Sequence, residues 1–338
     1  MAATSSITRH DAPGGARVYR LPLRVFPGLE ANAYLIVDGA YHALVDTGSG
    51  LDQSDPDLAA GVEAVRAEHG EAVSLARLDR IILTHGHIDH YGGLDFVRRH
   101  SDAPIAIHAY DRRVIEHHHE RHITVAHGLR RFFRQAGLDA PALEAAMDLY
   151  HGSRAAFVGG PVATSLADGD VLDERFTVIH VPGHCPGQVC LQWGDLLFTA
   201  DHVLPATFPH LAPESITPWT GLAHYLDALV RVEALPGVRL ALPGHGDALT
   251  DLPRRIGQLR ESNARKLTRV AEACAEPRTI AEITAMIYPR TRPYEALLAL
   301  EKIGAYVEHL DQQGLLSIAN LEAVAADEHA APRWLAIP

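Results

Sequence analysis

The chain has 338 residues, of which 47% are hydrophobic and 21% charged, a composition typical of soluble globular proteins. Its formal net charge of −12 disfavours nucleic acid as a partner, and the lack of an 18-residue apolar run argues against a membrane span. Three cysteines without a CxxC pair give no disulfide framework, so we expect a reducing compartment, the cytoplasm.

The first third of the chain is predicted to alternate strands with helices. Residues 1–16 lack an apolar segment and are expected to form a disordered leader. After them, apolar runs bounded by turn residues predict strands, and apolar residues at helical spacing predict helices. We expect strands at residues 16–23, 31–39, 42–50, 78–85 and 103–110, and helices at 56–69 and 94–100.

A helical insertion is predicted at about residues 111–156, after which strands resume. Strands are expected at 176–183, 188–194, 195–201 and 238–246, and helices at 221–235 and 254–275. Pro277 ends the last helix, so the main domain is predicted to span residues 17–275.

Residues 276–320 are predicted to form a small winged-helix-like module of two helices and a short extended piece. The remaining residues, 321–338, are expected to be an irregular tail anchored by Trp334 and Leu335. Within residues 279–315 three basic residues stand against five acidic ones, a balance of −2. We therefore expect this module to cover a pocket or to form a homodimer contact rather than to read DNA.

The chemically informative feature is the segment THGHIDH, which contains His85, His87, Asp89 and His90. It directly follows a buried strand, where α/β folds commonly place their sites. Imidazole and carboxylate are ligands for zinc, and also for iron or manganese. In an extended loop His85 and His87 would point the same way and share one metal, while Asp89 and His90 could turn toward a second.

Four side chains cannot fill two coordination shells, so further ligands are needed. Three other loops offer candidates, each a short polar segment after an apolar strand: His184 in VPGHCPG, Asp201 in LLFTAD and His245 in LPGHGD. The glycines of these loops allow the backbone to bend close to a metal.

These segments, in this order, resemble the metallo-β-lactamase superfamily and its H-x-H-x-D-H motif. The segment NAYLIVDGAYHALVDTGSG resembles the entry strands of the family, with Asp46 at its first motif aspartate. The likeness covers about residues 17–250 and implies an α/β (α+β) fold, a four-layer αβ/βα sandwich with the site at one edge of two sheets. The C-terminal module is similar to the winged-helix appendage of a lactamase-like branch of LACTB-2 type.

The resemblance also implies the roles of the site residues. His85, His87 and His184 would bind one metal, Asp89, His90 and His245 a second, and Asp201 would bridge them. Asp46 would orient a ligand histidine or close the loop network. The implied cofactors are two Zn²⁺ ions per chain, although iron or manganese would accept the same ligands.

We expect a hydrolase in which a hydroxide bridging the two metals attacks a small-molecule ester, thioester or lactone, with Asp89 orienting the nucleophile. The alternatives are a mononuclear-iron persulfide dioxygenase, a phosphodiesterase or nuclease, a promiscuous β-lactamase, and a non-catalytic metal-binding sensor. Asp201 argues against a true β-lactamase, which usually lacks the bridging aspartate.

Several positions bear on the pocket rather than on the metals. The family usually has glycine where Ala200 stands, and the extra methyl is tolerated if φ is negative there. Tyr91 could face the substrate or simply pack, and His202 could touch substrate. Cys185 is expected to pack. The candidates for receiving an anionic substrate are Arg112, Arg113, Arg130 and Arg131.

Overall fold

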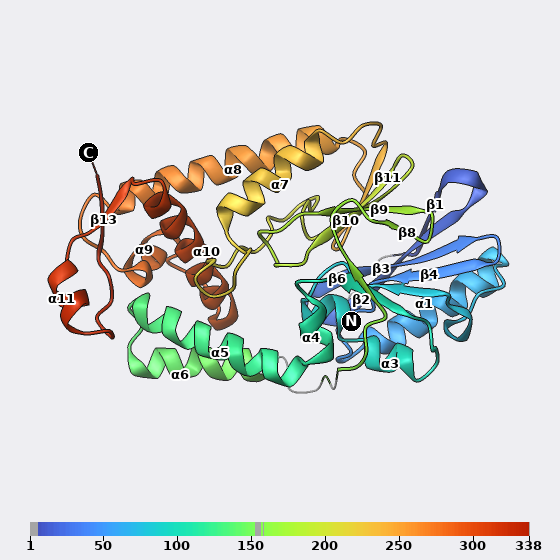
Figure 1. Ribbon diagram of the computed structural model, residues 1–338, viewed down its shortest axis with the longest axis horizontal. Coiled ribbons are helices and arrows are strands. Elements are labelled where there is room, and N and C mark those ends of the chain that lie inside the picture. The colour runs from blue at the N-terminus through green and yellow to red at the C-terminus, as the bar shows by residue number, and fades with distance from the viewer. Residues whose placement is uncertain (1–5, 153–156, 158, 338) are drawn as a thin grey trace.

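The computed structural model describes residues 6–152, 157 and 159–337, and Figure 1 shows two facing sheets with helices on their outer sides. The first sheet runs in chain order: β1 (Thr8–Asp11), β2 (Arg17–Phe26), β3 (Leu29–Asp38), β4 (Tyr41–Val45), β5 (Arg80–Ile82), β6 (Ile105–His108) and β7 (Thr164–Leu166). The second runs from β12 (Leu240–Pro243) through β11 (Leu196–Ala200), β10 (Val189–Trp193) and β9 (Phe176–His180) to β8 (Val171–Leu172).

The two sheets pack face to face because their strands alternate apolar side chains between two faces. On β3, Tyr34 and Ile36 point to the core between the sheets, while Leu35 and Val37 point outward to helices. On the second sheet, Phe198 lies in the shared core and Leu197 faces the outer helices. Both sheets are thus buried on both faces.

The outer layers complete a four-layer αβ/βα sandwich, which confirms the predicted fold class. The helices α1 (Ser54–His69), α2 (Ile88–Tyr91) and α3 (Leu94–Arg98) lie against the first sheet. The second sheet is covered by α7 (Leu222–Glu233) and the long α8 (Leu252–Ala273). None of the described helices is long and apolar enough to cross a membrane.

The predicted insertion consists of α4 (Arg112–Glu116), α5 (His118–Gln135) and α6 (Ala140–Gly152), and its residues 153–156 lie outside the described part of the chain. Figure 1 shows the α5–α6 pair extending away from the sheets toward the C-terminal module. The two parts are joined directly, because the Ala281 N–H donates a hydrogen bond to the Ala136 carbonyl (2.8 Å).

The C-terminal module contains α9 (Ile280–Ile287), α10 (Pro293–Gln312), β13 (Leu316–Ile318), α11 (Leu321–Ala326) and β14 (Trp334–Ala336). A capping box between Thr279 and Glu282 begins α9. Tyr306 of α10 packs in the same apolar cluster as Ile256 of α8, so the module shares its core with the main domain. The division of the chain into domains stays a prediction.

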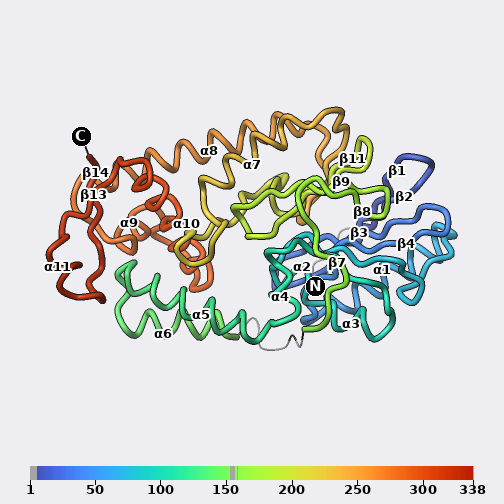
Figure 2. Tube along the Cα trace, viewed as in Figure 1, coloured from blue at the N-terminus to red at the C-terminus, as the bar shows by residue number. Residues whose placement is uncertain are grey.

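Two expectations at the ends of the chain were wrong. Thr8–Asp11 is not a disordered leader, because it pairs antiparallel with β2 as β1; residues 1–5 lie outside the described part of the chain. The tail is not irregular either, since Trp334 and Leu335 lie on β14, which pairs with β13 (Figure 2). The polar segment Thr8–Asp11 forms a hairpin with β2 through the turn at Pro13–Gly15, and it carries no apolar run that would predict a strand. The partner of β14 is β13, which lies about 16 residues earlier in the chain, so local composition does not reveal that pairing.

Candidate metal centre

The predicted ligands come together at one edge of the two sheets. His85 follows β5, His184 follows β9, Asp201 follows β11 and His245 follows β12, each within a few residues of the strand end. Asp89 and His90 lie on the short helix α2 rather than in the extended loop that we expected. Backbone bonds fix the loops, for example from Gly244 N–H to the Ala200 carbonyl (2.8 Å).

A first group consists of three imidazole nitrogens. His87 Nδ1 lies 3.1 Å from His85 Nε2 and 2.8 Å from His184 Nε2. Two nitrogens bound to one zinc at 2.0–2.1 Å in a tetrahedral site would be about 3.3 Å apart, so the observed spacing is close to that of a ligand set.

A second group lies beside the first and contains Asp89, His90 and His245. The Asp89 Oδ2 atom is 3.4 Å from His245 Nε2 and 3.8 Å from His90 Nε2. Asp201 lies between the two groups, because its carboxylate oxygens are 3.3 Å from His245 Nε2, 3.4 Å from His90 Nε2 and 3.6 Å from His184 Nε2. All seven predicted ligands are thus brought together, while their roles as ligands stay predictions.

Hydrogen bonds on the far side of the rings fix which nitrogen faces the centre. His184 Nδ1 donates to the His210 carbonyl (2.7 Å) and His245 Nδ1 donates to the Glu30 carbonyl (2.6 Å). His90 Nδ1 donates to Asp46 Oδ2 (2.9 Å). Since carbonyl and carboxylate oxygens only accept, each Nδ1 carries the proton, and Nε2 is left as the atom that can bind a cation.

The centre fits a cation on two grounds. Among the described residues, His90 Nε2 and Asp201 Oδ1 are buried without a hydrogen-bond partner, and buried polar atoms are rarely left so. The charge distribution points the same way. Burial alone would lower the pKa of His245, but the carboxylates of Asp201 and Asp89 raise this pKa to about 10. The carboxylates therefore attract positive charge, and a metal ion would supply it in place of protons.

Asp46 connects three parts of the site. Besides His90, its carboxylate accepts hydrogen bonds from the backbone N–H and the hydroxyl of Thr84, each at 2.8 Å. Thr84 in turn contacts His85 Nδ1 at 3.0 Å. These contacts suit a residue that orients ligand histidines, and this role of Asp46 stays a prediction.

The backbone at Ala200 differs from expectation. Its φ is +46°, in the left-handed region that glycine adopts freely and alanine does not. The negative φ under which the extra methyl of Ala200 would be tolerated is therefore not observed. The backbone is strained at this position, directly before Asp201. Glycine is required nearby at Gly244, where a Cβ atom would lie 2.3 Å from Asp201 Oδ1.

Sequence reasoning missed a buried carboxylate that joins two ligand loops. Asp111 is 1% exposed and accepts hydrogen bonds from Gly86 N–H (2.8 Å), Gly187 N–H (3.0 Å) and the Cys185 thiol (3.1 Å). Gly86 lies between His85 and His87. Burial raises the pKa of Cys185 well above its ordinary value, so the thiol stays protonated as the donor. A lone aspartate after a strand gave no signal of this role.

The two residues proposed to contact substrate are buried. Tyr91 is 1% exposed, and its hydroxyl lies 3.3 Å from His118 Nδ1, so the packing alternative describes it. His202 is fully buried beside Tyr225, with ring centroids 5.2 Å apart, and does not face open solvent. Burial lowers the pKa of His202 to about 3, so this ring is neutral.

A pocket of about 320 Å³ lies between the insertion and residues 217–219, and none of the seven predicted metal ligands lines it. Its lining includes Pro186, two residues after His184, together with Tyr110, Trp219, Arg113 and Arg121. Of the four arginines predicted to receive an anionic substrate, Arg113 alone lines this pocket. Arg112 and Arg130 form ion pairs with Glu116 and Glu144, and Arg131 contacts the Ser215 carbonyl.

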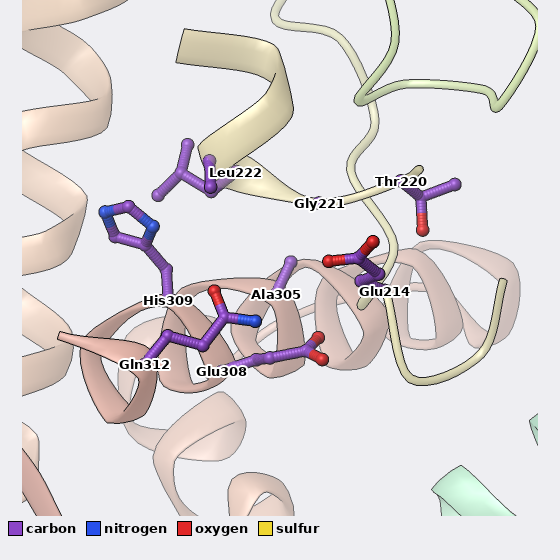
Figure 3. A pocket seen from close by; sticks show the side chains of 9 residues that line it. Glu214, Thr220, Gly221, Leu222, Ala305, Glu308, His309 and Gln312 are labelled. Carbon is purple, nitrogen blue, oxygen red and sulfur yellow. The ribbon is translucent and has the colours of Figure 1, made fainter. Parts of the chain in front are cut away.

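A second cavity has a volume of about 10 Å³, which is room for one water molecule. Figure 3 shows it between α10 and the segment that leads into α7, with Glu214 and Glu308 on its wall. It is a joint between the module and residues 214–221 rather than a substrate site.

The fold and the ligand cluster define a metallo-hydrolase type of centre, in which histidines and aspartates meet at the edge of a β-sandwich. The family described as the metallo-beta-lactamase superfamily matches residues 27–248. The chain therefore belongs to the metallo-β-lactamase superfamily, as its motifs predicted; the branch of LACTB-2 type stays a prediction.

Relatives of known name include thioesterases and a metallo-hydrolase. The chain is 25% identical over 232 residues to the atrochrysone carboxyl ACP thioesterase of Aspergillus fumigatus, covering 67% of this chain but 54% of that protein. It is 27% identical to the human acyl-coenzyme A thioesterase MBLAC2, covering 64% and 74% of the two chains. It is 28% identical to the probable metallo-hydrolase YflN of Bacillus subtilis, covering 65% and 82%. The chain thus spans about half the length of the fungal relative.

Solved structures match the fold over nearly the whole chain. A metallo-beta-lactamase family protein from Thermus thermophilus has a TM-score of 0.76 at 21% identity and covers 95% of this chain and 98% of its own. A beta-lactamase domain protein from Burkholderia ambifaria has a TM-score of 0.75 at 22% identity, covering 97% and 93%. The insertion and the C-terminal module are therefore part of a shared fold.

Proposed function

We propose that this chain is a metal-dependent hydrolase that holds two divalent ions, zinc by preference, and cleaves a thioester or related carbonyl ester of a small molecule. The observation that carries the proposal is the position of Asp201. Its carboxylate lies within 3.6 Å of histidines from both ligand groups, as a bridging residue between two ions would. Two bound cations would supply a water that ionises near neutral pH and a Lewis acid for the attacked carbonyl.

The protein's own residues then hold and orient the reactants. His90, His184 and His245 are fixed by their outer hydrogen bonds, so their Nε2 atoms are preorganised for the ions. Asp89 faces the centre, 3.4 Å from His245, and is placed to accept a proton from the attacking water and to orient it. The buried thiol of Cys185 is bound to Asp111 and takes no part as a nucleophile.

The names of the relatives favour a thioester over an ester or a lactone as the substrate. Those relatives act, by name, on acyl-coenzyme A and on acyl groups of an acyl carrier protein. Their substrates share a thioester carbonyl attached to a long anionic leaving group. We therefore place a small-molecule thioester first among the substrates of this chain.

Hydrolysis by the purified protein tests the proposal. Metal-loaded protein is assayed against a panel of acyl-coenzyme A thioesters, N-acetylcysteamine thioesters, aryl esters and lactones. We expect thioester cleavage that His87→Ala abolishes together with metal binding, while His127→Ala, an exposed histidine on α5, leaves both unchanged. Cleavage that persists in His87→Ala, or metal-loaded protein that is inert across the whole panel, would contradict the proposal.

A further inference from the structure

The 320 Å³ pocket, which Pro186 connects to the loop of His184, carries an exposed aromatic pair. Tyr110 follows β6 and Trp219 precedes α7, and their rings stack with centroids 5.3 Å apart and planes 22° from parallel. The two side chains remain 48% and 41% exposed, although burial of such rings is favourable. Large flat rings held at a pocket wall offer a surface on which another flat ring can stack.

The backbone at Trp219 is strained. Its φ is +70°, which is an outlier for a bulky residue. Hydrogen bonds hold it in place, because its N–H donates to Glu214 Oε1 (3.2 Å) and its carbonyl accepts from Gly183 N–H (3.0 Å). Since Gly183 directly precedes His184, this hydrogen bond joins Trp219 to the loop that carries a predicted metal ligand. Strain of this kind persists where the surrounding structure enforces it, and it is common at ligand sites.

The lining of the pocket also includes two guanidinium groups from the insertion, those of Arg113 and Arg121, together with the carboxylate of Glu120. Arg113 is already paired with Glu120. Arg121 lines the same pocket and is half-buried. Its guanidinium makes no hydrogen bond or ion pair with any residue that the structure describes, and its charge acts on the Asp111 carboxylate only at longer range. In a chain of net charge −12, a half-buried cation without such a partner marks a place where an anion can bind.

From these observations we propose that the Trp219 pocket binds a flat, anionic group of the substrate, an aromatic ring joined to a phosphate or carboxylate. The ring stacks on Tyr110 and Trp219, and Arg121 binds the anion. The proposal rests on the thioesterase function proposed above and adds the subsite that selects the substrate. With a volume of about 320 Å³, the pocket has room for such a group but not for a whole acyl-coenzyme A.

Two parts of a thioester could supply this chemistry. One is the adenine nucleotide of a coenzyme A leaving group, and the other is an acyl group derived from an aromatic dicarboxylic acid. Three substrates distinguish them: acetyl-coenzyme A, acetyl-N-acetylcysteamine, which lacks the nucleotide, and 4-carboxybenzoyl-N-acetylcysteamine, which carries the ring and carboxylate on the acyl side.

The variants are Arg121→Gln and Trp219→Asn; asparagine removes the ring but tolerates a positive φ. The matched control is Arg134→Gln, which removes the same charge from α5 about 20 Å further along the helix. We expect each pocket variant to raise KM about ten-fold for the substrate that fills the pocket, with kcat unchanged, and to leave acetyl-N-acetylcysteamine unaffected. The control should change neither.

Binding without turnover separates this proposal from the hydrolase proposal. Adenosine 3′,5′-bisphosphate and terephthalate are titrated calorimetrically into the metal-loaded protein and its variants. The subsite is supported if both pocket variants, but not Arg134→Gln, bind one of these probes about ten-fold more weakly, even if no substrate is cleaved. The probe that is affected shows which part of the substrate fills the pocket. The subsite would be overturned if both probes bound equally well to the wild type and to all variants and if the KM of every substrate stayed the same. This would hold even if hydrolysis is confirmed.

Discussion

Replacing Asp111 by alanine should disrupt the metal centre without touching a metal ligand. The carboxylate accepts N–H groups from Gly86 and Gly187, which belong to the loops of His85 and His184. Without it, both N–H groups are left in the interior with no acceptor, and the two loops lose their connection. The perturbation therefore acts on loop position rather than on the ligand set.

The expected magnitude follows from the hydrogen bonds that are lost. An unsatisfied buried N–H costs about 1–3 kcal/mol, so two of them cost about 2–6 kcal/mol. Burial raises the pKa of Asp111, which means that its ionised form already costs folding free energy and offsets part of this sum. We expect Asp111→Ala to lower the free energy of unfolding by about 3 kcal/mol and to weaken metal binding by about ten-fold or more.

Urea unfolding measures the first quantity, and competition with a chromophoric chelator measures the second. Asp170→Ala is the control, since Asp170 is exposed and accepts one backbone N–H, from Ala167 (2.8 Å). Its loss should cost under about 1 kcal/mol and leave metal binding unchanged. If Asp111→Ala were no more destabilising than the control and kept its metal, Asp111 would not be what holds the two loops in place.

Two further substitutions give sharp outcomes. Gly244→Ala should weaken metal binding, measured with the same chelator, because the new methyl would lie 2.3 Å from Asp201 Oδ1 and 2.8 Å from His90 Cε1; Gly257→Ala on α8, with open space around it, should not. Burial lowers the pKa of Lys302 from its ordinary value of 10.5 to about 8. Below pH 8 its charge therefore lowers the free energy of unfolding, and this cost disappears as the pH rises from 8 to 10.5. Lys302→Met should therefore raise the free energy of unfolding by about 2 kcal/mol at pH 7 and by much less at pH 10.5; an equal gain at both would contradict this.

The ligand set could be found in the sequence because each ligand has a strong local signal. Three histidines and an aspartate within THGHIDH are rare without a metal, and His184, Asp201 and His245 each follow an apolar strand. Apolar runs bounded by turn residues predicted most strands of both sheets, whereas the four-layer arrangement was implied by the resemblance of the motifs to the family. What the motif could not show was its own conformation, in which Asp89 and His90 lie on α2 instead of in an extended loop.

Features that depend on contacts between distant segments could not be predicted in this way. Asp111 has no motif, and its role exists only because the loops at Gly86 and Gly187 fold around it. Likewise, the positive φ of Ala200 results from loop closure and not from its side chain, which disfavours it. Arg121 and Trp219 are nearly a hundred residues apart in the chain, so the pocket that they share was not visible before the fold was known.

The metal content of the purified protein shows whether the centre is shared by two ions. Elemental analysis of the wild-type chain, with Asp201→Asn measured in parallel, counts the ions per chain. We expect two divalent ions in the wild type and a loss of at least one in the variant, because Asp201 lies against both ligand groups. One iron per chain together with oxygen consumption, or two ions retained in Asp201→Asn, would contradict it.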